Sequence, residues 1–127
     1  MYRKLVALVG ASLMIGVEVK EARVFVRPGA TDMRKQINGL VVIIEQVMEA
    51  NVFEPSLFLF CNGERRILKA VYWDRTGFCL WQKRLEKHRF PWPRTTEQAR
   101  CEIDAEKLRM LLHFWSAHQE LAYSRVS

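Results

Sequence analysis

The chain has 127 residues, of which 50% are hydrophobic. This length and composition suffice for one globular domain with its own core, and the chain is short for two domains. Its formal net charge of +6 favours an acidic partner, and we place nucleic acid ahead of a membrane because the charge is localised. The three cysteines, Cys61, Cys79 and Cys101, include no C-x-x-C pair. This count argues against a disulfide framework and for reduced thiols in a cytosolic setting.

The first thirteen residues are expected to be an N-terminal extension ahead of a single domain over residues 14–127. Two basic residues precede an apolar run over residues 5–16, a pattern that superficially resembles a signal peptide. Such a run is too short to cross a bilayer as a helix, and no clean Ala-x-Ala cleavage site is present. Met14 opens a stretch that would serve as an ordinary start. We therefore expect a cytoplasmic protein with no membrane partner.

A strand and a helix are predicted in the first part of the domain. Valines alternate with charged residues between residues 17 and 26, which predicts one or two short strands. After the break at Pro28, a helix is expected over about residues 31–50, with Thr31 as its N-cap and Asp32 in its first turn. The apolar stripe of this helix consists of Met33, Ile37, Leu40, Val41, Ile44, Val47 and Met48.

Three further strands are predicted to form a β-meander. They cover residues 57–60, 67–73 and 78–85. Asn62-Gly63 is a strong turn signal between the first two, and a four-residue turn over residues 74–77 joins the last two. The prolines of the following Phe-Pro-Trp-Pro run cannot donate to a ladder, so they end the sheet.

The second hairpin of the meander sets a register that places basic residues at its open end. If it closes tightly, Trp73 faces Phe78, and both faces of the hairpin become cationic away from the turn. Lys69, Lys83 and Arg84 are then expected close together, which like charges tolerate only when they are solvated or face an anion.

A last helix is predicted to begin near Asp104 and to run to about residue 120. Its apolar stripe consists of Leu108, Leu111, Leu112 and Trp115. The predicted fold class is therefore α+β: a single domain in which an antiparallel β-meander packs with the helix over about residues 31–50 and with this C-terminal helix.

Positive charge is concentrated in residues 61–94, which hold nine Lys or Arg against three acidic residues and are threaded with aromatic residues. Cations attract phosphates and rings can stack on bases, so this composition suits nucleic acid. The alternative is a half-buried sheet with its aromatic residues in the core and its cations on a solvated face. The predicted nucleic-acid-binding residues are Arg65, Arg66, Lys69, Arg75, Trp81, Lys83, Arg84, Lys87, His88, Arg89 and Trp92, with Trp81 and Trp92 as the stacking or wedge residues.

Four strings of the sequence together resemble one family. They are TDMRK at residues 31–35, LFLF at 57–60, the run from Tyr72 to Pro93, and LRMLL in the last helix. The resemblance is to the small TnpB accessory protein, the second reading frame, of insertion sequences of the IS66 type, and it extends from about Arg23 to Leu112. The signature residues are Thr31, Asp32, Met33, Arg34, Lys35, Trp73 and Asp74. The resemblance implies a protein that accompanies a separate transposase and is needed for efficient transposition, and it supplies no mechanism.

The signature at residues 31–35 has two interpretations. The N–H groups of a helix start, flanked by Arg34 and Lys35, could hold a phosphate. In the structural interpretation, which we favour, Thr31 caps the helix, Met33 lies in the core and Asp32 pairs with an arginine of the sheet.

Catalysis and metal binding find little support in the sequence. A transposase centre needs two or three carboxylates that converge on divalent metal, and the acids within the family-like strings, Asp32, Asp74 and Glu86, each have an ordinary explanation. The three histidines, His88, His113 and His118, and the cysteines fit no zinc spacing. We therefore expect no enzymatic activity, no cofactor and no metal.

The leading hypothesis is a non-enzymatic accessory factor for DNA transposition that binds nucleic acid, with the element ends as the expected target. About six neutralised phosphates would give a slope of roughly −5 for log K against log salt. The rival is an adaptor that docks on the transposase or another element-encoded protein, through the Leu108/Leu112/Trp115 helix or an unpaired sheet edge. A small nuclease is the third reading. The sequence leaves the oligomeric state open, a homo-oligomer included.

Overall fold

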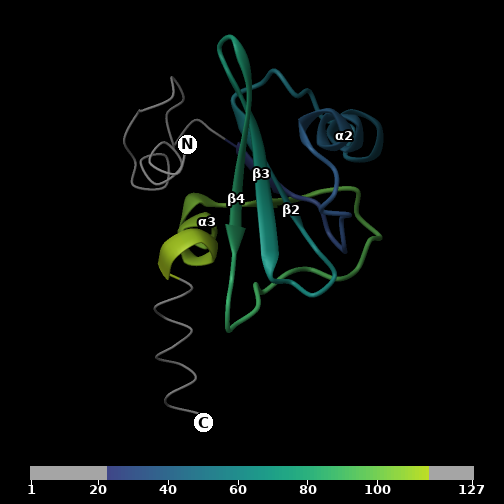
Figure 1. Cartoon of the computed structure of the whole chain (residues 1–127). Coiled ribbons are helices and arrows are strands. Elements are labelled where there is room, and N and C mark those ends of the chain that lie inside the picture. The colour runs from purple at the N-terminus through teal and green to yellow at the C-terminus, as the bar shows by residue number, and fades with distance from the viewer. Residues whose placement is uncertain (1–22, 115–127) are drawn as a thin grey trace.

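The computed structural model describes residues 23–114, which form a five-stranded sheet with a helix on each face (Figure 1). The fold is α+β and mostly antiparallel, as predicted. The strands are β1 (Arg23–Val26), β2 (Ser56–Cys61), β3 (Ile67–Asp74), β4 (Gly77–Arg84) and β5 (Cys101–Ile103). The helices are α2 (Ile37–Val42), which continues as a π-helical turn over Ile43–Val47, and α3 (Ala105–Arg109), which continues as one over Met110–Phe114.

The strand order in the sheet is β4-β3-β2-β1-β5. The predicted meander of β2, β3 and β4 is confirmed, and so is the register that sets Trp73 opposite Phe78. The sequence did not indicate that β1 pairs in parallel with β2, or that β5 joins the other edge of β1. The connection from β1 to β2 carries α2, because a parallel pair needs a crossover of this kind.

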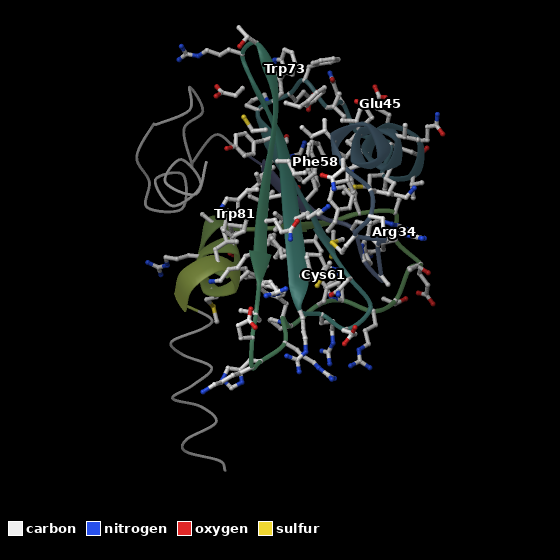
Figure 2. The ribbon with its side chains drawn as sticks, in the orientation of Figure 1. Arg34, Glu45, Phe58, Cys61, Trp73 and Trp81 are labelled. Carbon is white, nitrogen blue, oxygen red and sulfur yellow. The ribbon has the colours of Figure 1, made fainter. Side chains whose placement is uncertain are left out.

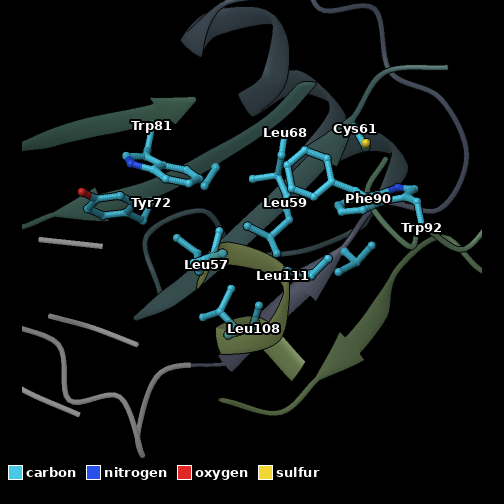
Figure 3. Packing of buried hydrophobic residues seen from close by; sticks show 14 of the residues in the cluster. Leu57, Leu59, Cys61, Leu68, Tyr72, Trp81, Phe90, Trp92, Leu108 and Leu111 are labelled. Atoms are coloured by element: carbon cyan, nitrogen blue, oxygen red, sulfur yellow. The ribbon is translucent and has the colours of Figure 1, made fainter. Parts of the chain in front are cut away.

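The sheet is buried on both faces, which explains why β2 reads as a continuous apolar run, SLFLFC. Because successive side chains of a strand point to opposite faces, each strand contributes to two cores. One core packs Leu40, Ile44 and Met48 of the first helix against Phe58 and Val71 of the sheet. The other core lies under α3 (Figure 3) and contains Tyr72, Trp81, Phe90 and Trp92, together with Leu57, Leu59, Leu108 and Leu111.

The first helix begins at Ile37 with Gln36 as its N-cap, so the prediction of a start at residue 31 with a Thr31 cap is wrong. Residues 31–36 form a turn instead. The Thr31 N–H donates to the carbonyl of Cys61 at 2.8 Å, and Asp32 Oδ1 accepts from the Arg34 N–H at 2.9 Å. Short polar side chains that bond nearby backbone groups compete with helix formation, which accounts for the later start.

Lys69 lies in the core with 2% of its surface exposed, so the prediction that it belongs to a basic surface is wrong. Its Nζ donates to the carbonyls of Met33 and Lys35 at 2.8 Å each. Loss of solvent lowers the pKa of Lys69, with the nearby Asp32 carboxylate acting in the opposite direction. This lysine therefore fastens the 31–36 turn to the sheet.

The last helix begins where the sequence predicts. Asp104 is its N-cap, and the carboxylate accepts from the Lys107 N–H at 2.8 Å. Leu108 and Leu112 pack into the core beneath it and are each 1% exposed. The predicted end near residue 120, Trp115, His118 and the N-terminal extension all lie outside the described residues, as does the first part of the predicted strand region at 17–26.

The cysteines of the described chain are free thiols. Cys61 is fully buried, and burial raises the pKa of its thiol to about 12, so it is neutral and inert as a nucleophile. Within residues 23–114, no helix has the length and apolar character needed to cross a membrane.

Lys69→Met is expected to lower the free energy of unfolding by about 1 to 3 kcal/mol, because two buried carbonyls lose their donor. Urea denaturation followed by tryptophan fluorescence measures this loss. Lys35→Met is the matched control, since the Lys35 side chain is exposed on the same turn, and its midpoint should stay close to that of the wild type. Equal midpoints for the two variants would contradict the role of Lys69.

Candidate nucleic-acid interface

The predicted basic residues are divided between the two ends of the β3–β4 hairpin. The strand pairing runs from Asp74 opposite Gly77 at the turn to Ile67 opposite Arg84 at the open end. Arg75 therefore lies at the tip of the hairpin, away from the other cations, and does not share a surface with them. In Figure 2, Trp73 marks the tip, Cys61 lies toward the other end, and nitrogen-tipped side chains gather around the turns beyond it.

We call residues 62–66 and 84–94, which lie at the open end of the hairpin, the basic end. These two segments contain six cations and two acids. The cations are Arg65, Arg66, Arg84, Lys87, Arg89 and Arg94. Because only Glu64 and Glu86 offset them, this end carries a clear excess of positive charge.

Backbone hydrogen bonds hold the two segments of the basic end side by side. The Leu85 N–H donates to the carbonyl of Arg66 at 2.8 Å, and the Phe90 N–H donates to the carbonyl of Arg65 at 2.7 Å. Arg66 Nη1 adds a bond to the carbonyl of Glu86 at 3.0 Å. Phe90 itself is fully buried in the core under α3, so the segment after β4 is anchored at both its backbone and its side chain.

A third segment, residues 27–31, crosses beside the other two. The Gly29 N–H donates to the carbonyl of Pro93 at 2.8 Å, and Trp92 Nε1 donates to the carbonyl of Arg27 at 3.0 Å. Gly29 has φ +79°, a conformation that glycine adopts without strain. The crossing is close, since a Cβ at this position would lie 2.7 Å from Cγ2 of Thr96.

A polar pocket of about 300 Å³ opens where the three segments meet. Arg65, Arg89 and Arg94 line it together with the Asn62-Gly63 turn. Among residues 23–114, none of these three arginines takes part in an ion pair. Arg65 adopts φ +60°, a left-handed conformation that is uncommon outside glycine, and its N–H is bonded to the carbonyl of Asn62 at 3.0 Å. Three arginines without an ion pair in this part of the chain therefore line one preformed cavity.

Burial removes both proposed stacking residues from the surface. Trp81 is 4% exposed and Trp92 is 7% exposed, and both belong to the core under α3. The prediction that they act as stacking or wedge residues is wrong, because both rings pack in the core between the sheet and α3 and are not accessible to bases. Trp92 still forms part of the pocket wall, with its indole N–H already bonded.

Lys83 lies on the face of the sheet opposite Lys69 and Arg84, so the prediction that these three gather together is wrong. The Lys83 Nζ donates to the carbonyl of Leu112 at 2.7 Å, which ties β4 to the last helical turn. Partial burial lowers the pKa of Lys83. Lys83 therefore links the sheet to the helical layer that covers this face.

The other predicted binding residues between 84 and 89 lie at the basic end, as expected. Lys87 and Arg89 are exposed, and His88 is half-buried between them in sequence. Arg84 is exposed and pairs with Glu86, with its Nε 3.0 Å from Oε2. A surface ion pair of this kind is weak and screened by salt, so Arg84 stays available to a stronger anion.

Two residues of the TDMRK signature at 31–35, Asp32 and Met33, have structural roles. The Asp32 carboxylate is held by hydrogen bonds from Arg34, which lower the pKa of Asp32 to about 2. Since the helix starts at Ile37, the interpretation of residues 31–35 as a phosphate-binding helix start is wrong. Asp32 forms its ion pair with Arg34 of the same turn, so the prediction that it pairs with an arginine of the sheet is wrong as well. Met33 packs against the core as predicted.

The three acids within the family-like strings lie in different parts of the molecule. Asp32 pairs with Arg34 in the 31–36 turn, Asp74 ends β3 at the hairpin tip, and Glu86 lies at the basic end beside Arg84. Within the described residues, no group of three or more potential metal ligands comes together. Among residues 23–114, these three carboxylates therefore do not converge on one site.

Comparison with known proteins decides the family. The model of the family described as IS66 Orf2 like protein matches residues 22–120. The chain belongs to this family. The resemblance drawn from the sequence strings is therefore confirmed, and it implies an accessory role in insertion-sequence transposition.

Two curated relatives come from Sinorhizobium fredii. The uncharacterized protein y4hO is 33% identical over 93 residues, which cover 73% of this chain and 80% of the relative. The uncharacterized protein y4jC is 31% identical over 71 residues, which cover 56% of this chain and 61% of the relative. No solved structure matches the chain.

Sequence reasoning missed the contribution of residues 27–31 and of Arg94 to the site. Pro28-Gly29 was a recognisable chain break, yet nothing in the sequence shows that the break crosses beside the Asn62-Gly63 turn. Arg94 was part of the charge excess of residues 61–94 and was absent from the predicted binding residues. The signal available in the sequence was its position in the basic segment, directly after the Phe-Pro-Trp-Pro run.

Gly29→Ala is expected to lower the free energy of unfolding by about 1 to 3 kcal/mol, because the added Cβ meets Thr96 at an unfavourable φ. Thermal or urea unfolding measures the change. Gly77→Ala is the matched control, because a Cβ there meets nothing within 4 Å. A Gly29 variant as stable as the Gly77 variant would show that the crossing is not tight.

Proposed function

We propose that this protein is a non-enzymatic accessory factor for transposition and that it binds the phosphates of nucleic acid through its basic end. The observation that carries the proposal is the convergence of Arg65, Arg89 and Arg94 on one preformed pocket, with Lys87 exposed on the adjoining segment. Guanidinium groups present several donors in a fixed fork, which suits phosphate oxygens. Family membership supplies DNA transposition as the setting.

Binding of this kind is electrostatic and largely independent of the base sequence of the nucleic acid. The buried tryptophans do not offer an exposed stacking platform, and phosphate contacts position a protein without reading bases. The cations at this end that make no ion pair or side-chain hydrogen bond within the described residues are Arg65, Lys87, Arg89 and Arg94. Neutralisation of one phosphate charge by each of these four cations gives a slope of about −3.6 for log K against log salt, shallower than the value of roughly −5 expected from the sequence.

The adaptor hypothesis retains one specific observation. Leu108 and Leu112 are buried and cannot form the docking surface that the sequence suggested. Phe53, however, is 57% exposed at the hairpin tip, where its ring lies 4.9 Å from that of Trp73 and 5.8 Å from that of Phe78. Exposed aromatic residues are typical of protein contact sites. In this second candidate function, the tip docks on the transposase or on another element-encoded protein.

Replacing Arg65, Arg89 and Arg94 together by glutamine is expected to weaken binding to a short duplex by more than about tenfold at low salt. The salt slope should become shallower by up to about three, because each lost cation releases roughly one counterion fewer on binding. Fluorescence anisotropy across a salt series measures both quantities.

The matched control replaces Lys35, Arg75 and Lys107 by glutamine, which removes the same charge from exposed positions elsewhere. Its affinity and slope should stay close to those of the wild type apart from a small long-range effect. Equal losses in both triple variants would show that only net charge matters. No binding by the wild type at about 50 mM salt, together with nuclease-resistant capture of the transposase, would overturn the proposal in favour of the adaptor.

A further inference from the structure

We propose that the pocket between Arg65, Arg89 and Arg94 takes a phosphate monoester at the end of a DNA strand. This inference rests on the proposed function and names the chemical group that the same site receives. It distinguishes the pocket from the rest of the basic end, which faces the continuous phosphodiester backbone.

The charge of the pocket exceeds what an internal phosphate requires. An internal phosphodiester carries one negative charge, whereas a phosphate monoester carries about −1.5 to −2 at neutral pH and presents three terminal oxygens. Three arginines line this one cavity, and their combined charge and donors match the higher charge and the larger number of acceptors. The three arginines make no ion pair within residues 23–114, so their mutual repulsion is relieved best by a dianion.

The shape of the pocket also favours a terminal group. It is a recess of about 300 Å³, at the small end of the range for ligand sites. An internal phosphate is flanked by sugars on both sides and touches a recess only at its rim, whereas a terminal phosphate protrudes and can enter. The wall includes Trp92 and Pro93, which offer apolar contact to the single adjoining sugar.

The recess is built before any ligand arrives. Its three segments are joined by the bonds from Phe90 to Arg65 and from Gly29 to Pro93. Preformed geometry lowers the ordering cost of binding and makes selection between similar groups possible. A strand end of this kind arises whenever water cleaves a phosphodiester, because one product end keeps the phosphate and the other becomes a hydroxyl. Transposition requires DNA breaks, so the pathway of this family supplies the ligand.

The test compares three versions of one short duplex, with a 5′-phosphate, with a 3′-phosphate, or with hydroxyls at every end. Anisotropy at about 150 mM salt is expected to show about tenfold tighter binding for one phosphorylated version than for the hydroxyl version. The two phosphorylated versions reveal which strand end is recognised. The Arg89→Gln/Arg94→Gln variant should lose this preference.

Lys87→Gln is the control, since Lys87 is exposed at the same end and does not line the pocket. It should weaken all three duplexes alike and leave the preference intact. Equal affinity for the three duplexes, with a loss in the arginine variant, would refute the inference and leave the proposed function standing. A preference that survives in the arginine variant would refute the assignment to this pocket. If no duplex binds the wild type, the proposed function fails and this inference with it.

Discussion

The basic end depends on two backbone hydrogen bonds, from the N–H groups of Leu85 and Phe90 to the carbonyls of Arg66 and Arg65. These bonds bring the β2–β3 turn beside the segment that leaves β4. Without them the cations of the two segments would belong to separate loops. Phe90 secures the arrangement, because its fully buried ring fixes the chain between Arg89 and the Pro91-Trp92-Pro93 run. Core packing thus determines where the surface charge is placed.

Burial of the sheet on both faces explains why several residues serve structure instead of binding. A sheet covered by α2 and α3 has little solvated face left for cations (Figure 1). Lys69 and Lys83 therefore point to opposite layers. Lys69 donates to two carbonyls of the 31–36 turn, and Lys83 donates to the carbonyl of Leu112 in the π-helical turn after α3. Trp81 and Trp92 fill the layer under α3. Exposed charge collects at the ends of the strands, where turns leave room for it.

The sequence predicted local features well and long-range ones poorly. Alternation and turn chemistry located β2, β3 and β4 and set Trp73 opposite Phe78, because hairpin register depends on neighbouring residues. The parallel pairing of β1 with β2 and the short β5 depend on contacts between distant segments. For the site, charge density identified residues 61–94, yet periodicity could not show that Lys69 turns inward or that Gly29 crosses beside Arg94. Helix α2 starts late because Asp32 bonds Arg34 locally.

A map of backbone amide chemical shifts during titration with a short duplex tests whether the basic end is the surface that contacts nucleic acid. The shifts are expected to concentrate in residues 27–31, 62–66 and 84–94, the three segments around the pocket. Shifts centred on Phe53, Trp73 and Phe78, with the basic end unchanged, would contradict this expectation.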